Sequence, residues 1–279
     1  MEGHEVRKLT ALEDTHWWYR ERRVLLSRAL AGRTPGVALD IGAAGGGNTR
    51  VLVGHGWRAA ALEYGQDGAA VCAERGIPAL RGDATRLPVS PASLDLVVAF
   101  DILEHLDDDA GAVAEIMRVL KPGGTLLVSV PSDPRLWSEH DVAVGHVRRY
   151  TRPALQELLL GGGLELEQLR SWMVLLRPAV ALRRLVSKGS DLKDVPGWLN
   201  QTLFALVAAE RRLPVGRLQG VSLLARCRKP AGPQPVLDLR RSGELPQALR
   251  ESAAPAASTA PAASTAIDGR APIGSSKES

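Results

Sequence analysis

Residues 37–50 constrain the fold more than any other stretch of this chain. An apolar run, Val37–Ile41, carries an acid at Asp40 and leads into a cluster of glycines, after which a helical pattern begins. That order predicts a β-strand, a tight turn and a helix. Glycines let a turn lie close to a ligand, and the free amides of a helix N-terminus attract carboxylates and phosphates. The stretch therefore predicts a binding site for a nucleotide-like cofactor.

Strand and helix patterns alternate as far as about residue 130. Short apolar runs are separated by turns and amphipathic segments, a pattern typical of parallel sheets with helices on both faces. We expect strands at residues 37–41, 58–63, 78–81, 94–100 and 125–130, and helices at 47–54, 67–75 and 109–120. This order predicts a doubly wound, Rossmann-like α/β sheet that binds its ligand at the carboxyl ends of the strands.

The chain beyond residue 130 contains a helix, two strands and an insertion. Residues 151–160 predict a helix that begins after Thr151 as its N-cap. Strands are expected at 164–171 and 221–228. Between them lies a helical, apolar and basic insertion, residues 172–219; residues 173–230 hold eleven Lys or Arg against three Asp or Glu.

The two ends of the chain differ from this core. Residues 16–30 predict an amphipathic helix ahead of the first strand. In the last segment, residues 231–279, the sequence Ala-Pro-Ala-Ala-Ser-Thr occurs twice in succession. Small and polar residues without large apolar partners cannot offset the entropy of ordering, so we expect this tail to be disordered.

Composition excludes several classes of protein. A net charge of +4 over 279 residues is too small and too dispersed to indicate nucleic-acid binding. Cys72 and Cys227 lie far apart without metal-type spacing, so we expect two reduced thiols in the core of a cytoplasmic protein, and neither a disulfide nor a metal site. The N-terminal residues predict no secretory signal, and no run reaches the length of a membrane span.

Five ordered motifs together resemble the class I S-adenosylmethionine-dependent methyltransferases, in particular the small-molecule group typified by the enzymes of ubiquinone and menaquinone biosynthesis. The resemblance covers about residues 17–228 and is far more specific than one glycine loop. The motifs are Leu39-Asp-Ile-Gly-Ala-Ala-Gly-Gly46, Glu63, Gly82-Asp-Ala84 before Leu87-Pro88, Asp95–Asp101 running into Leu103-Glu-His-Leu106, and Leu120-Lys-Pro-Gly-Gly124. The resemblance implies a mainly parallel seven-stranded sheet with a reversed final strand, and S-adenosylmethionine as the cofactor.

The resemblance also implies a role for each motif. Glu63, at a strand end, would accept hydrogen bonds from both ribose hydroxyls, which a carboxylate can do with two adjacent oxygens. Asp83 and the Ala84 amide would contact the adenine. The remaining cofactor contacts would go to the methionine part, from Asp40, Gly42, Gly46, the Phe100 backbone and His105.

One position departs from the family pattern. The middle glycine of the loop is Ala44, and Ala43 precedes it. Alanine tolerates a left-handed backbone poorly. Either this turn does not need that conformation or the loop is shifted, with modestly weaker cofactor binding as the expected consequence.

Two other functions fit parts of the sequence. The loop Gly42–Gly47 matches a relaxed nicotinamide-dinucleotide fingerprint, and an acid near position 63 suits a ribose in either cofactor. A dinucleotide oxidoreductase, however, leaves Asp40, the Gly82–Ala84 motif and Lys121–Gly124 unexplained. The second alternative is a non-catalytic protein of methyltransferase fold that only binds its partner.

The acceptor side is expected in the loop that follows the strand at 125–130. Residues 131–150 hold two histidines, several acids, an arginine pair and aromatics. We predict His140 or His146 as a general base for methylation at oxygen or carbon, because histidine is suited to proton transfer near neutral pH. The alternative is that this loop has a purely structural role: it positions the next helix, and Arg148 and Arg149 form ion pairs with acidic residues.

The N-terminal segment and the insertion predict further contacts. Residues 1–36 are expected to form a helical lid on a domain that spans 37–230, and Tyr19 or Arg23 to touch the cofactor or the substrate. The insertion at 172–219 predicts an apolar acceptor pocket, a homodimer interface or a peripheral contact with an anionic membrane. We thus predict a methyltransferase that acts on a small-molecule or lipid-like acceptor.

Overall fold

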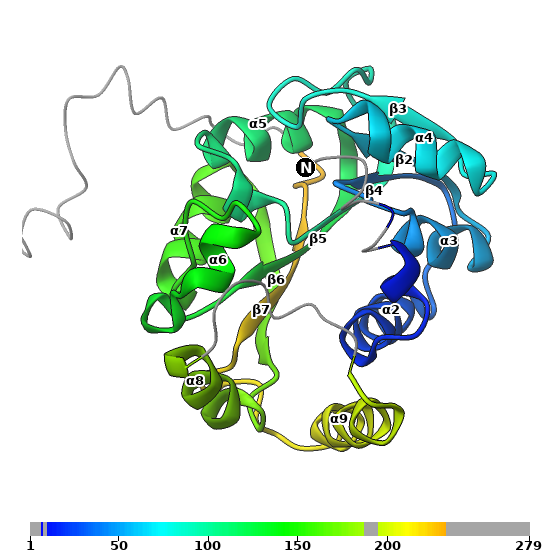
Figure 1. Ribbon diagram of the computed structural model, residues 1–279. Coiled ribbons are helices and arrows are strands. Elements are labelled where there is room, and N and C mark those ends of the chain that lie inside the picture. Colours follow the sequence, from blue (N-terminus) through cyan, green and yellow to red (C-terminus); the bar gives the residue numbers. More distant parts are fainter. Residues whose placement is uncertain (1–6, 8–9, 187–194, 233–279) are drawn as a thin grey trace, which may run out of the picture. The chain divides into compact units, whose positions relative to one another are not determined.

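A seven-stranded sheet forms the centre of the part of the chain that the structure describes, as Figure 1 shows. The computed structural model describes residue 7, residues 10–186 and residues 195–232. The strands are β1 (Val37–Ile41), β2 (Arg58–Glu63), β3 (Ala79–Arg81), β4 (Leu94–Phe100), β5 (Leu120–Pro131), β6 (Glu165–Trp172) and β7 (Ser222–Arg228). The α-helices are α2 (Trp17–Leu30), α3 (Gly47–Gly54), α4 (Gln66–Glu74), α5 (Asp109–Val119), α6 (Glu139–Ala143), α7 (Arg152–Gly161), α8 (Arg177–Val186) and α9 (Gly197–Glu210).

The strand order confirms the predicted fold class. The order is β3-β2-β1-β4-β5-β7-β6, in which β1 to β5 pair in parallel and β7 runs antiparallel to both β5 and β6. Successive strands are added on one side of β1 up to β3 and on its other side from β4 onward, so the connections that follow β1 and β4 diverge at one edge of the sheet. This switch point is where α/β sheets place ligands.

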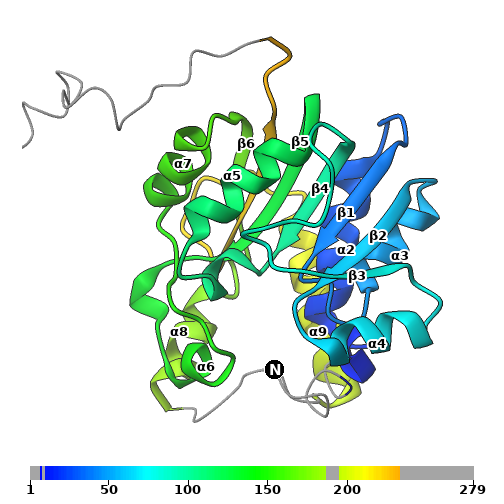
Figure 2. The same cartoon turned by 90° about the horizontal axis from the view of Figure 1, so that it is seen from above.

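Helices cover both faces of the sheet, and each face has its own core. On one face, α5 and α7 bury residues such as Ile116 and Leu155. On the other face, α2 and α3 bury residues such as Leu26 and Leu52, and α8 and α9 extend this core. Figure 2 shows α5 and α7 in front of the strands. Because both faces are covered, the central strand β4 is apolar along most of its length.

Local signals set the ends of several helices. The Thr151 side chain accepts a hydrogen bond from the Ala154 amide, and proline follows in the first turn of α7, as the sequence predicted. Asp108 caps α5 in the same way through the Gly111 amide. His16 caps α2 by accepting from the Trp18 amide. Each cap satisfies an amide that the first turn of a helix leaves unpaired.

The fifth strand is longer than the expected 125–130. It begins at Leu120 because Leu120 pairs with Leu94 of β4, after which the register shifts and the pairing resumes at Thr125. The Lys121 ammonium lies 2.8 Å from the Asp95 carboxylate and holds the irregular start against β4. The Lys-Pro-Gly-Gly segment therefore ends α5, as predicted, and also belongs to the strand.

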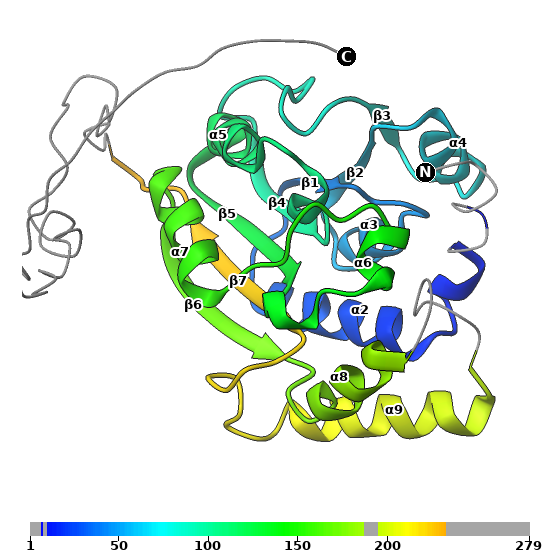
Figure 3. The same cartoon turned by 60° about the vertical axis from the view of Figure 1, so that its left-hand side comes forward.

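The remaining expectations concern the tail, the two cysteines, membrane-spanning helices and the insertion. The expected tail, residues 231–279, lies outside the described residues except for its first two. Cys72 and Cys227 are both free and buried. Among the described residues no helix has the length and apolar character needed to cross a membrane. The predicted insertion, residues 172–219, contains α8 and α9; α9 lies beside α2 in Figures 1 and 3.

Helix α2 is anchored in the core, and this generates a prediction. The Leu26 side chain is fully buried against the sheet. Leu26→Ala is expected to lower the free energy of unfolding by about 3 kcal/mol, since it removes apolar contacts and leaves a cavity. Urea denaturation measures this change. Arg28→Ala, at an exposed position of the same helix, is the control and should change it by less than about 0.5 kcal/mol. Equal effects of the two substitutions would mean that α2 is a detachable lid.

Candidate functional site

A cavity of about 970 Å³ opens at the carboxyl ends of β1, β2 and β4. Its volume lies within the range of about 300–1,000 Å³ typical of small-molecule sites. The loops after these strands form its floor, α2 forms one wall, and α8 and α9 contribute apolar side chains. The predicted site residues that line it are Tyr19, Arg23, Gly42, Glu63, Asp83, Ala84, Phe100, His105, His140 and His146.

Two of the predicted cofactor residues do not line the cavity. Asp40 is buried in β1, where its carboxylate accepts a hydrogen bond from the Thr49 hydroxyl at 2.7 Å. Burial raises the pKa of Asp40 to about 7. Gly46 packs against Ile77, since a Cβ at this position would lie 2.3 Å from the Ile77 side chain. Both residues therefore support the loop from the side that faces the protein interior and do not face the cavity.

The loop after β1 has a left-handed turn at Ala44. Its φ angle is +50°, so alanine adopts the conformation that the family pattern assigns to glycine. The sequence left open whether the turn needs this conformation, and in the structure Ala44 adopts it. The Ala44 amide donates a short hydrogen bond to the Glu63 carboxylate at the end of β2. This contact links the two loops that border the expected ribose position.

Glu63 and Asp83 stand on the same side of the cavity. Burial is the main cause that raises the pKa of Glu63 to about 7, and the Ala44 amide opposes that shift. Asp83 accepts hydrogen bonds from the amide and the hydroxyl of Thr85, both at 2.8 Å and both on Oδ1. The Asp83 carboxylate is therefore fixed in orientation by a local turn.

Sequence reasoning missed Glu13, which precedes α2. Its carboxylate accepts a hydrogen bond from the Gly47 amide at the N-terminus of α3, at 3.0 Å, and lies 2.7 Å from the Arg75 guanidinium. It is buried and it lines the cavity. The anion-binding end of α3 is thus occupied by a side chain of the protein itself. No local pattern around Glu13 indicates this contact, which joins residues 34 positions apart.

Arg22 is a second residue that the sequence analysis missed. It is buried, its guanidinium lies 3.2 Å from the Asp101 carboxylate, and it also donates to the Phe100 carbonyl. The guanidinium packs over the Trp18 ring as well. Arg23, which was predicted, donates instead to the carbonyls of Glu13 and Asp14. The four-residue spacing of Trp18, Arg22 and Leu26 was a signal that could have identified Arg22 as part of the inward face.

Three histidines gather at the opposite end of the cavity. The ring centroids of His105 and His146 are 4.8 Å apart, and those of His140 and His146 are 6.1 Å apart. His105 belongs to the turn after β4, whereas the other two come from the loop after β5. The sequence predicted a cofactor contact for the first and base catalysis for the others, and the structure brings all three together.

Asp141 organises this histidine cluster. Its fully buried carboxylate lies 2.8 Å from His146 Nδ1 and 2.8 Å from the Arg149 guanidinium, and 3.2 Å from that of Arg184. Burial alone would raise the pKa of Asp141, but the hydrogen bond from His146 and the two arginine charges outweigh burial and lower it to about 2. The expected pairing of Arg148 and Arg149 with acids is also present, since Arg148 contacts Asp109. The loop is therefore both a structural support and part of the cavity.

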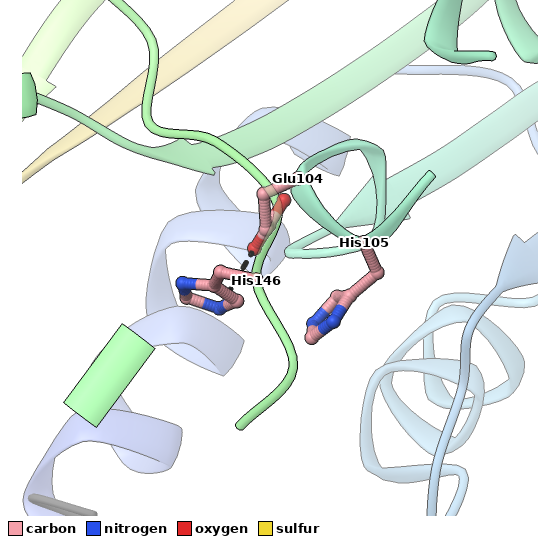
Figure 4. Close-up of side chains that lie close together, drawn as sticks. All are labelled: Glu104, His105 and His146. Carbon is pink, nitrogen blue, oxygen red and sulfur yellow. Dashed lines mark ion pairs between the residues drawn. The ribbon is translucent and has the colours of Figure 1, made fainter. Parts of the chain in front are cut away.

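Glu104 lies between these histidines and the sheet. The side chain is fully buried, and neither carboxylate oxygen has a hydrogen-bond partner. Burial, together with the charge of Asp101, raises the pKa of Glu104 well above its ordinary value. Figure 4 shows Glu104, His105 and His146 converging. One potential ligand atom from each lies within 4.8 Å of the others, so these residues could hold a metal ion.

The wall formed by α8, α9 and the residues before α8 is apolar. Its side chains include Met173, Leu176, Val180, Leu199 and Leu203, all of which line the cavity. On the outside of the same helices, Leu182 is 67% and Trp198 is 72% exposed. The cavity therefore has a polar end at the glycine loop and an apolar side formed by the insertion.

Comparisons with known proteins identify the domain around this cavity. Residues 39–128, from β1 to β5, match the family model described as "Methyltransferase domain". A probable S-adenosylmethionine-dependent methyltransferase of Mycolicibacterium smegmatis is 33% identical over 168 residues, 58% of this chain and 64% of that protein. A demethylmenaquinone methyltransferase of Mycolicibacterium vanbaalenii is 31% identical over 124 residues, 44% of this chain and 53% of that protein. The chain thus spans less than two thirds of the length of either relative.

This chain contains a methyltransferase domain at residues 39–128. Solved methyltransferase structures share its fold. A methyltransferase from Mesorhizobium loti aligns with a TM-score of 0.54 at 17% identity, over 77% of this chain and 99% of that one. Phosphoethanolamine N-methyltransferase 2 from Haemonchus contortus, solved with S-adenosylmethionine, aligns with a TM-score of 0.55 at 18% identity, over 75% of this chain and 52% of that one.

The methyltransferase domain bears strain at its departure from the family pattern, and this strain is testable. A left-handed alanine costs about 1–2 kcal/mol, whereas a glycine adds about 0.4–1 kcal/mol of chain entropy to the unfolded state. Ala44→Gly is therefore expected to raise the free energy of unfolding by up to about 1 kcal/mol, measured by urea denaturation. Ala43→Gly is the matched control: Ala43 has no positive φ, and the change should destabilise the domain. Destabilisation of similar size by both substitutions would contradict the assignment of strain to Ala44.

Proposed function

We propose that this protein transfers a methyl group from S-adenosylmethionine to a small-molecule or lipid-like acceptor, at oxygen or carbon. The observation that carries this proposal is that the cofactor-side carboxylates Glu63 and Asp83 and the histidine cluster line one cavity. A methyl donor held at one end of the cavity would meet an acceptor held at the other. The methyltransferase family of the domain and the named relatives support the same reaction class.

The cofactor would lie across the ends of β1, β2 and β4. Glu63 would accept the ribose hydroxyls, and Asp83 with the Ala84 amide would contact the adenine. The loop from Gly42 to Ala44 and the Phe100 backbone would border the methionine part. The common cavity supports this arrangement. Gly42 supports it too, because a Cβ at this position would lie 2.8 Å from the Ile102 side chain, so only glycine lets the loop pack this closely against Ile102.

Helix α2 would close the methionine end. Of its residues, Arg22 points a buried guanidinium at the Phe100 carbonyl, and we assign it to the methionine carboxylate. Tyr19 lines the same wall and would contact the cofactor or the acceptor beside it. Arg23 also lines the cavity, but its guanidinium donates hydrogen bonds to the carbonyls of Glu13 and Asp14. Its role toward the cofactor would therefore be indirect, to hold the segment that carries Glu13 in place.

The protein's part in the reaction is orientation, exclusion of water and control of one proton. Bound S-adenosylmethionine supplies a methyl group whose bond to sulfur breaks with the electron pair left on sulfur. The acceptor atom supplies the electron pair of the new bond and gives up its proton. The walls of the cavity hold the two in line, which is the main requirement of a displacement of this kind.

Of the two histidines predicted to act on that proton, we assign His146. Its Nδ1 faces Asp141 at 2.8 Å, so the ring orientation is fixed and Nε2 is directed away from Asp141. His140 lies on the short helix α6, with its ring centroid 6.1 Å from that of His146, and would border the acceptor. His146 is thus the catalytic residue of the proposal.

The apolar wall supports a lipid-like acceptor. Leu176, Val180 and Leu203 can bury an apolar tail while the reacting group faces the histidines. The exposed side chains of Leu182 and Trp198 flank this wall, and the basic composition of residues 173–230 favours an anionic surface. A peripheral contact with a membrane through α8 and α9 would present such an acceptor to the cavity.

Transfer of a labelled methyl group tests the proposal. With methyl-labelled S-adenosylmethionine, we expect label in the apolar fraction of a cell extract. Glu63→Ala should weaken cofactor binding by about 1.5–3 kcal/mol in calorimetry, since charge-assisted hydrogen bonds are lost. Glu74→Ala removes an exposed carboxylate and is the control. Cofactor binding without label in any fraction would leave only the non-catalytic role, and binding of a nicotinamide dinucleotide instead would refute the proposal.

Cofactor affinity is expected to rise with pH. Burial raises the pKa of Glu63 to about 7, so the carboxyl is largely protonated at pH 6 and ionised at pH 8. The ribose hydroxyls donate best to the ionised form, and affinity follows the ionised fraction, which grows about tenfold over this interval. Calorimetry of S-adenosylhomocysteine between pH 6 and 8 measures the change.

The matched control for this pH dependence is Glu63→Gln, which keeps the shape of the side chain and does not titrate. Titration of the ligand's own amine and of Asp40 is shared by both proteins. The variant should therefore lose the part of the pH dependence that belongs to Glu63. An identical pH profile in the two proteins would remove Glu63 from the ribose site.

A further inference from the structure

Glu104, His105 and His146 have the spacing of ligands that share one ion. One potential ligand atom from each residue lies within 4.8 Å of the other two, and His146 Nε2 is 3.8 Å from Glu104 Oε1. Two ligands bound to the same zinc-like ion at about 2.0–2.2 Å are separated by about 3.4 Å in tetrahedral geometry. The Glu104 and His146 atoms are within about 0.4 Å of this separation, and atoms 4.8 Å apart would have to approach by about 1.4 Å. Figure 4 shows the three side chains around a common point.

Each of the two imidazole rings is held by a contact at its Nδ1 atom. His146 Nδ1 lies 2.8 Å from the Asp141 carboxylate, and His105 Nδ1 lies 3.0 Å from the Gly145 carbonyl. In a neutral ring, a proton on the nitrogen that faces an acceptor leaves a free lone pair on Nε2. Metal-binding histidines in proteins almost always have such an outer partner on the second nitrogen, either a carboxylate or a backbone carbonyl.

Glu104 provides an independent observation at the same point. It is fully buried, both of its oxygens lack a hydrogen-bond partner, and it lines the cavity. A buried carboxylate without hydrogen bonds is costly unless a cation compensates it. The nearby guanidinium groups are engaged elsewhere, Arg22 with Asp101 and Arg149 with Asp141. Among the described residues no arginine or lysine is paired with Glu104, so a bound cation would compensate this carboxylate.

We propose that Glu104, His105 and His146 bind a divalent transition metal ion of the zinc type, with an open coordination position toward the acceptor end of the cavity. Two imidazole nitrogens and one carboxylate oxygen suit zinc, cobalt, nickel, manganese or ferrous iron, whereas magnesium and calcium prefer oxygen ligands alone. Three protein ligands are the number that catalytic sites of this kind use.

The consequence for the reaction rests on the proposed function. An acceptor hydroxyl at the open position would release its proton more readily, because a divalent ion lowers the pKa of a bound hydroxyl group. Its oxygen would then take the methyl group, while the bond to sulfur breaks with the electron pair left on sulfur and the proton passes to solvent. With the ion bound, His146 Nε2 would be a ligand, so the acceptor's proton would pass to solvent and not to His146. His105 would serve the ion and not the cofactor, in contrast to the contact predicted from the sequence.

The test is a metal titration of the full chain without an affinity tag and without cofactor, after treatment with a chelator. Calorimetry with Zn²⁺ and visible absorption with Co²⁺ are expected to give one ion per chain with micromolar or tighter affinity. Glu104→Gln and His146→Ala should each weaken binding at least tenfold. His55→Ala, which removes an exposed histidine outside the cavity, is the control and should leave the affinity unchanged. Thermal melts establish that each variant is folded.

The results separate this inference from the proposed function. A lack of binding at tens of micromolar protein, or equal affinities of the wild type, Glu104→Gln and His146→Ala, would overturn the metal site and leave the histidines as a packed pair. Because the titration contains no S-adenosylmethionine, binding of that cofactor by a chain that binds no metal defeats only this inference. Metal binding by a chain that binds no S-adenosylmethionine defeats only the proposed function.

Discussion

Parallel pairing of β1 with β2 on one side and β4 on the other is the constraint on which the rest of the site depends. Ile41 is in register with both Leu62 and Ala99, so the three strands end at the same level. The residues directly after these positions, such as Gly42 and Glu63, therefore lie at one edge of the sheet. Their proximity results from strand pairing and not from any short-range sequence pattern. The short hydrogen bond from Ala44 to Glu63 then joins two of these loops. The cofactor contacts proposed for Gly42, Glu63 and the Phe100 backbone derive from this common edge.

The parts of the fold that sequence predicted well are those fixed by local pattern. The expected bounds of β1, α3, β2 and β4 coincide with the observed ones, since apolar runs and glycines mark their ends. The start of β5 was missed because it depends on pairing between Leu94 and Leu120, which are distant in sequence. Ala44 shows the same limit within the site: the sequence revealed a departure from the family pattern, but only the backbone showed that alanine adopts the glycine conformation.

At the acceptor end, the sequence predicted which residues take part but not which of them contact each other. The sequence singled out the histidines and the arginine pair, yet Asp141, which binds His146, Arg149 and Arg184 together, stood among several equivalent acids. The partner of each charge is decided by the folding of segments that are far apart, such as α8 against the loop after β5. Arg22 is different, because its four-residue spacing from Trp18 and Leu26 was visible in the sequence. A periodicity analysis that includes charged residues would have placed it in the cavity wall.

Glu13 has a consequence for which ligands the glycine loop admits. A dinucleotide places its pyrophosphate at the N-terminus of the helix that follows the first strand, where free amides and the helix dipole stabilise negative charge. In this protein the Gly47 amide at that position already donates to a carboxylate, whose other oxygen is neutralised by Arg75. An incoming pyrophosphate would have to displace this buried ion pair. The helix N-terminus that a dinucleotide uses is therefore already filled by a carboxylate of the protein, whereas the proposed cofactor has no phosphate that needs it.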